Sequence, residues 1–165
     1  MLDSFSVRAR QIVFAARLKA GERGASLIDM DDFLVGIVLE DQGLLEQSVF
    51  SSIFEGQGRL VNEALSHIPF FSAKVADDLL AHLKNILPQS QPMALTFEIP
   101  LSSSLERVFD SAKAVQAQFQ HAEIEPLHLL AAMLNTDSSE GVRFLRRFGM
   151  TRERVLSTLS GSTEN

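Results

Sequence analysis

Two similar stretches, 96 positions apart (124 minus 28), constrain this chain more than any other feature of its sequence. Residues 28–39 have the sequence IDMDDFLVGIVL and residues 124–134 have the sequence IEPLHLLAAML. Each begins with an isoleucine and a polar opening, then continues as an almost unbroken apolar run. A helix that is apolar on nearly every face is a buried helix. The pair therefore predicts a duplicated helical architecture with these two segments at its centre.

The same offset aligns the residues that precede these stretches, in pattern more than in identity. The positions Phe5, Ser6, Ile12, Val13, Ala16 and Arg17 correspond to Leu101, Ser102, Val108, Phe109, Ala112 and Lys113. Both copies thus open with an amphipathic helix of the same phase. We predict an all-α fold, a pseudo-twofold tandem repeat of two four-helix units with one extra helix between them, in a single domain over residues 1–165.

We place repeat one at residues 3–69, an inserted helix and extended linker at 70–100, repeat two at 101–160 and a tail at 161–165. Residues 72–87 have good helical phase but no counterpart at the end of repeat two. The prolines at 88, 92 and 100 exclude a helix through the following stretch, in which apolar residues alternate from 93 to 99. This extended stretch is either a linker that packs against the surface of the domain or a segment that occupies a binding groove in the place of a bound peptide.

Capping residues and glycines suggest the limits of the other helices. The first helix is expected from Ser4 to Ala20, with Ser4 or Ser6 as its cap and Gly21 and Gly24 at its end. Acidic residues at 29, 31 and 32 suit the start of the second helix. Further helices are expected at 44–54 and 60–68, from Ser102, Ser103 or Ser104, at 141–148, and after Thr151 as a cap.

Composition excludes several classes of function. The 165 residues include no cysteine, so disulfides, thiolate metal sites and thiol nucleophiles are excluded. No apolar run is long enough to cross a bilayer and no signal peptide is visible, which predicts a cytoplasmic protein with no membrane partner. The net charge of −6 argues against nucleic acid. The one basic cluster, at 143, 146, 147, 152 and 154, is interpreted as a solvated face or a protein contact.

No catalytic apparatus is visible, which predicts a non-enzymatic binding module without cofactor or metal. The acidic pairs at 31–32 and 77–78 point about 100° apart on a helix and do not converge. His121, Glu123, Glu125 and His128 have spacings that match no established metal site. His128 is better interpreted as a buried histidine bonded to the backbone. A small metal-dependent hydrolase built on His121 and His128 is kept as a remote alternative.

Three motifs resemble the Clp N-terminal domain, the double-repeat helical module that precedes the ATPase rings of the Clp and Hsp100 unfoldases. These motifs are FSVRA at 5–9, IEPLHLL at 124–130 and GVRFLRRFGM at 141–150. The resemblance covers both repeats and leaves the insert at 72–99 uncovered. No Gly-x-x-x-x-Gly-Lys-Ser/Thr motif occurs, so this chain does not hold ATP by that device.

The resemblance implies a chaperone domain, linked to proteolysis and the stress response, that docks substrates or adaptors through apolar grooves. Its implied partners are adaptor proteins, unfolded or tagged polypeptides, and an ATPase ring of the same or another chain. The alternative is a free-standing adaptor or decoy that lacks its own ATPase.

Candidate contact residues follow from the resemblance and from the apolar pattern. They are Phe5, Ser6, Asp31, Phe97, Ser102 and Phe109. One branch of the family binds phosphorylated arginine. Mapped by position, its two sites would be Ser6 with Asp31 and Ser102 with Leu127, the second without an acid. The alternative is that both serines are only helix caps and that Asp31 is only a first-turn acid.

Overall fold

The computed structural model describes residues 2–45, 68–93, 98–136 and 139–163, and these are helical with connecting loops. The helices are α1 (Val7–Glu22), α2 (Met30–Asp41), α5 (Ala73–Ile86), α6 (Ser103–Gln118), α7 (Pro126–Leu134), α8 (Glu140–Arg147) and α9 (Arg152–Thr163). The predicted all-α class is confirmed. In these ranges, no helix combines the length and apolarity that a membrane span requires.

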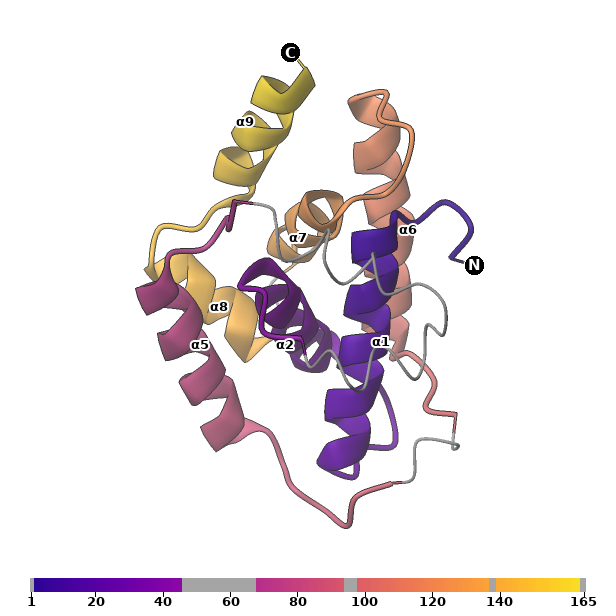
Figure 1. Ribbon diagram of the computed structural model, residues 1–165, viewed down its shortest axis with the longest axis vertical. Helices are drawn as coiled ribbons and strands as arrows, with labels where there is room; N and C mark the ends of the chain where they lie inside the picture. Colours follow the sequence, from indigo (N-terminus) through magenta and orange to yellow (C-terminus); the bar gives the residue numbers. More distant parts are fainter. Residues whose placement is uncertain (1, 46–67, 94–97, 137–138, 164–165) are drawn as a thin grey trace.

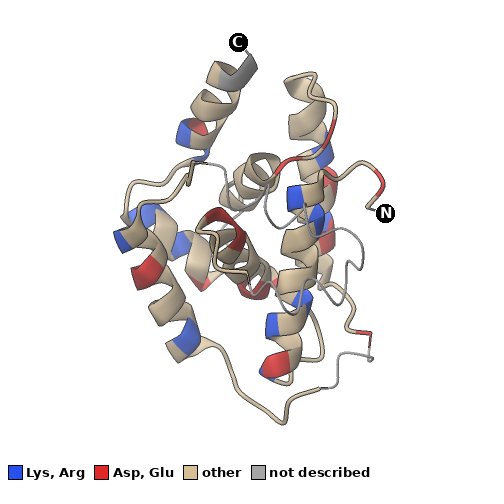
Figure 2. Cartoon of the chain, viewed as in Figure 1, with Lys and Arg blue, Asp and Glu red and all other residues tan. Residues whose placement is uncertain are grey.

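The two apolar stretches form the centre of the molecule, as predicted. Figure 1 shows α2 and α7 in the middle, with α1 and α6 on one side and α5 and α8 on the other. Helix α7 carries no charged residue, whereas the acids of α2 lie at its two ends (Figure 2). Phe33, Leu34, Leu129 and Leu130 are fully buried. Burial of each such side chain contributes about 1.5–3 kcal/mol to folding.

Helix starts follow the capping residues in the sequence. The Ser6 hydroxyl accepts a hydrogen bond from Ala9 N at 3.1 Å, and the Ser102 hydroxyl accepts one from Leu105 N at 3.2 Å. The cap of α1 is therefore Ser6. Helix α1 continues to Glu22, so the expectation that Gly21 ends it is wrong by about half a turn. Gly24, with φ of +74°, makes the exit turn.

The first two helices of each unit match at the predicted offset. Helices α1 and α6 have 16 residues each and begin at 7 and 103, while α2 and α7 begin at 30 and 126. Two isolated parallel bridges join Phe5 to Ile124 and Ile28 to Leu101. The 96-residue offset converts one bridge into the other, so the two contacts are reciprocal. The helices expected at 44–54 and 60–68 lie largely outside the described residues, so two four-helix units remain a prediction.

Helix α5 occupies the predicted place of the inserted helix and begins after the cap Ser72. It packs against α2 of the first unit and α8 of the second, so it bridges them. The described ends of the following linker are tied down, because Met93 N donates to Gly21 O at 2.9 Å and Ile28 N donates to Pro100 O at 2.8 Å. Residues 94–97, with Phe97, lie outside the described residues.

The end of the chain differs from the prediction. Helix α9 extends through Thr163, so the expectation of a tail from residue 161 is wrong for the first three positions. Gly161 lowers helix propensity by about 1 kcal/mol, which is too little to end a helix whose preceding turns are already formed.

Candidate functional site

We call the line where the two predicted units meet the seam, defined by the contacts of Phe5 with Ile124 and of Ile28 with Leu101. Phe5 and Phe109 lie there with ring centroids 5.2 Å apart, edge to face. Together with Leu101, they line a cavity of about 230 Å³ whose other walls are polar (Glu106, Asp110 and Lys113). Both rings are at most 3% exposed. These two candidate contacts are thus mainly core residues that reach the floor of a small cavity.

Ser6 lies across the seam from the opening of α7. Its amide donates to Ile124 O at 2.9 Å, and its hydroxyl forms a side-chain hydrogen bond with Glu125. Burial raises the pKa of Glu125, while the bond to Ser6 and the charge of Arg8 oppose that rise. Ser6 therefore acts as a cap and also holds a partly buried carboxylate from the other unit.

Asp31 points to a different helix. Its carboxylate accepts a hydrogen bond from Gly141 N at 3.1 Å and a side-chain bond from Ser139, and burial raises its pKa. Asp31 therefore stabilises the start of α8. The predicted pair of Ser6 with Asp31 shares no hydrogen bond, because the start of each unit lies against the opposite unit rather than its own.

The second predicted pair, Ser102 with Leu127, is also separated, because Ser102 too lies against the opposite predicted unit. Ser102 N donates to Ile28 O at 2.9 Å, so Ser102 adjoins the opening of α2. Leu127 instead lines a cavity of about 550 Å³, which we call the larger seam cavity; its walls also include Arg8, His121, Glu123, Glu125 and Leu159. The resemblance alone could not reveal that each serine lies beside a helix of the opposite repeat, since it aligns positions within a single repeat.

An ion pair fixes one wall of the larger seam cavity. Arg8 donates through Nε and Nη2 to the two oxygens of Glu40, both at 2.8 Å. The Glu40 side chain is fully buried and that of Arg8 is 28% exposed. A bidentate pair with one buried member locks α1 onto the last turn of α2. Arg8 is therefore committed to the fold, and sequence analysis gave no sign of this pair.

A histidine pair fixes another wall of that cavity. His128 is fully buried, and its Nδ1 accepts a hydrogen bond from Glu125 N at 2.8 Å, which confirms the prediction of a buried histidine bonded to backbone. Its Nε2 therefore carries the proton and lies 2.8 Å from His121 Nδ1. Burial, with a smaller effect of His121, lowers the pKa of His128 to about 4.

These bonds leave His128 without a free ring nitrogen for a metal. Across the described ranges, no group of three or more metal-ligating side chains comes together. The pair holds the start of α7, and nothing in its geometry supports the remote alternative of a hydrolase.

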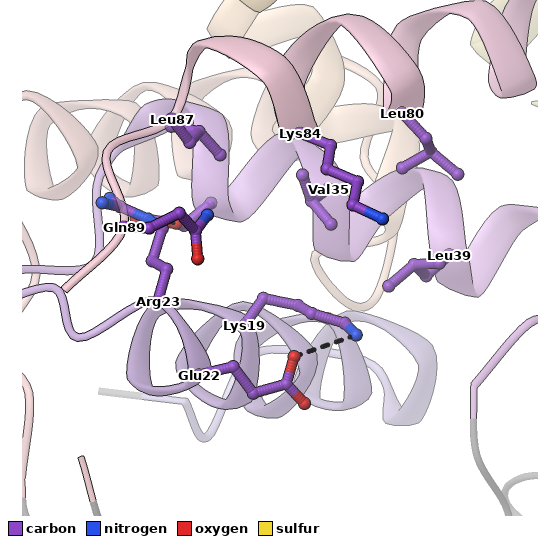
Figure 3. Close-up of a pocket in the computed structure, with 10 residues that line it drawn as sticks. Lys19, Glu22, Arg23, Val35, Leu39, Leu80, Lys84, Leu87 and Gln89 are labelled. Carbon is purple, nitrogen blue, oxygen red and sulfur yellow. Dashed lines mark hydrogen bonds and ion pairs between the residues drawn. The ribbon is translucent and has the colours of Figure 1, made fainter. Parts of the chain in front are cut away.

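A third cavity, of about 410 Å³, lies between α1, α2 and α5, and we call it the α1–α5 groove (Figure 3). Its lining is part apolar (Val35, Leu39, Leu80 and Leu87) and part polar (Lys19, Glu22, Arg23, Asp32, Lys84 and Gln89). Arg23 donates to both oxygens of Asp32, at 2.7 and 2.8 Å, and closes one side. Sequence analysis missed this groove because its walls combine the consecutive helices α1 and α2 with α5, which is distant from them in the sequence.

Comparison with known proteins identifies the fold. The family model of the Clp repeat N-terminal domain matches residues 101–165. No curated protein matches the sequence as a relative. The structure resembles the N-terminal domain of the chaperone ClpD from Arabidopsis thaliana, with a TM-score of 0.64 and 19% identity over 100% of this chain and 97% of the other.

A second solved structure, from a study of a malarial protein secretion system, has a TM-score of 0.70 and 16% identity over 98% of this chain and 95% of the other. These likenesses span both predicted units, whereas the family model covers the second. The chain therefore has the fold of a Clp N-terminal domain, and its residues 101–165 match the family model of the Clp repeat N-terminal domain.

Proposed function

We propose that this chain is a docking domain, which captures polypeptide substrates or adaptor proteins for a Clp-type ATPase ring in the same or another chain. The observation that carries this proposal is the seam. Two cavities open along it, and each has an apolar part beside charged side chains. Clefts with that composition suit an extended polypeptide. Its apolar side chains are stabilised by burial against apolar walls, and its backbone amides and carbonyls require polar groups nearby.

The chemistry of the described residues supports binding rather than reaction. Arg8 and His128 are committed to the fold, since Arg8 holds Glu40 and His128 is bonded to both His121 and the start of α7. Side chains whose hydrogen bonds are already made within the fold can contribute shape and charge to a binding surface. Docking at micromolar strength fits this role, because a domain that hands its cargo onward must also release it.

Binding of a chemically unfolded, fluorescently labelled polypeptide to the purified chain tests the proposal. Leu127 is half-buried in the larger seam cavity, whereas Leu156 is also half-buried, on α9, and lines none of the three cavities. We expect Leu127→Ser to weaken binding several-fold and Leu156→Ser to leave it unchanged. The absence of binding by the folded wild-type chain, up to millimolar polypeptide, would overturn the proposal.

A further inference from the structure

The α1–α5 groove has an unbalanced set of charges above its apolar floor. Lys19 pairs with Glu22 at 3.2 Å, and Arg23 is held by Asp32 and also donates to Pro88 O at 3.2 Å. Lys84 is exposed, and within the described ranges no ion pair reaches it. One uncompensated positive charge therefore remains on the wall of the groove, in a protein whose net charge is −6.

The two lysines lie on facing walls of the groove. Figure 3 shows the side chain of Lys84, from α5, reaching towards α1, with the ammonium groups of Lys84 and Lys19 both on the side of the groove near Leu39. Glu22 would compete only weakly with a ligand for Lys19. The Lys19 and Glu22 side chains are 40% and 65% exposed, and ion pairs at such exposed positions contribute little to stability. An incoming carboxylate placed between the two ammonium groups would contact both.

The floor beneath the lysines suits an apolar side chain. Val35 and Leu39 come from α2, while Leu80 comes from α5 and Leu87 directly follows it, so the two helices supply facing apolar walls. A volume of about 410 Å³ lies in the range of ligand-binding clefts. The buried ion pair of Arg23 with Asp32 closes one side with a rigid, already satisfied polar surface.

We propose that the α1–α5 groove binds a polypeptide segment in which an apolar side chain is followed by a carboxylate side chain. The apolar residue occupies the floor formed by α2 and α5, and the carboxylate bridges Lys19 and Lys84. This inference rests on the proposed docking function and adds a second docking surface, away from the seam, with a defined charge preference.

A charge-swap experiment tests the inference. The probes are two labelled peptides with the same leucine-containing core, one flanked by glutamates and one by lysines, titrated into the chain by fluorescence anisotropy. We expect the acidic peptide to bind about tenfold more tightly, since two exposed charge pairs that each contribute about threefold in affinity together amount to about one decade. Lys84→Glu should reverse this preference.

The matched control is Lys74→Glu, on the same helix α5. Lys74 is exposed, pairs with Asp78 at 3.1 Å and does not line the groove, so the substitution changes the net charge equally. We expect it to leave the preference for the acidic peptide intact. Equal effects of the two substitutions would mean that only the overall charge acts, and would overturn the inference.

Two further outcomes separate this inference from the proposed function. If both peptides bind alike and Lys84→Glu changes nothing, while Leu127→Ser still weakens the unfolded polypeptide, docking stands and the groove inference fails. If neither peptide nor the unfolded polypeptide binds the wild-type chain, the proposed function itself fails.

Discussion

The ring nitrogens of His121 and His128 lie 2.8 Å apart, and the second imidazole is fully buried. His128 accepts the Glu125 amide on one nitrogen and donates to His121 through the other. Protonation of His128 would put a second proton on the nitrogen that faces the amide and break the cap of α7. Burial is the main cause of the lowered pKa of His128, and His121 adds to it.

The stability of the chain should therefore fall as the pH falls from about 6.5 towards 4. The unfolded chain binds a proton at His128 near the ordinary pKa of 6.5, whereas the folded chain resists protonation until about 4. The stabilising contribution of neutral His128 is complete above this window and is lost within it. We expect a loss of about 2 kcal/mol between about pH 7.5 and pH 5, measured by urea unfolding.

The control for this prediction is His128→Asn, which does not titrate in the window. Glu125 and Asp31 have raised pKa values, so their protonation favours the folded chain and acts in the opposite direction at the acid end. Comparison of both proteins at each pH isolates the histidine. A wild-type slope equal to that of the variant would contradict the assigned hydrogen bonds.

Loss of Arg8 should be costly. Arg8→Ala removes both hydrogen bonds from Glu40 and leaves that fully buried carboxylate without its cation. A broken pair of this kind typically destabilises a protein by about 3–5 kcal/mol. Arg10→Ala, two positions away, changes the same charge at an exposed site and should stay within about 0.5 kcal/mol of the wild type. Thermal or urea unfolding of the two variants measures the difference, and similar stabilities would be incompatible with a structural role for Arg8.

Gly141 should tolerate no side chain. A methyl group there would lie 2.5 Å from Leu34 Cδ2 and 2.7 Å from Asp31 Oδ1, so it would disturb both the core and the bond that begins α8. We expect Gly141→Ala to destabilise the chain by about 1–3 kcal/mol. Gly161→Ala is the control: nothing lies near that position in α9, and alanine should stabilise the helix slightly. If calorimetry gives the two variants equal midpoints, the packing of α8 against α2 is not as described.

Local features of the fold could be predicted because single residues determine them. Ser6, Ser72 and Ser102 cap helices where a hydroxyl precedes an apolar stripe, and Pro126 begins α7 where its missing amide proton costs nothing. The apolar runs marked α2 and α7 as central because they offer no polar face to water.

Interactions across the fold could not be predicted in the same way. The pairs Arg8 with Glu40 and Arg23 with Asp32 join residues 32 and 9 positions apart, and no periodicity marks them. The crossing at the seam, which puts Ser6 beside Glu125 instead of Asp31, depends on how two units pack. Phe5 and Phe109 suit either a core or an apolar groove by their type, and only the packing of their rings shows that they are mainly core residues.

The most direct test of the docking account is an NMR titration of the isotope-labelled chain with an unfolded polypeptide. The account predicts that amide signals shift in residues around the larger seam cavity, including Leu127 and Leu159, while those of α8, which lines none of the three cavities, remain in place. The contrary result is a folded chain whose spectrum does not change, or changes uniformly over all helices, as the polypeptide is added to millimolar concentration.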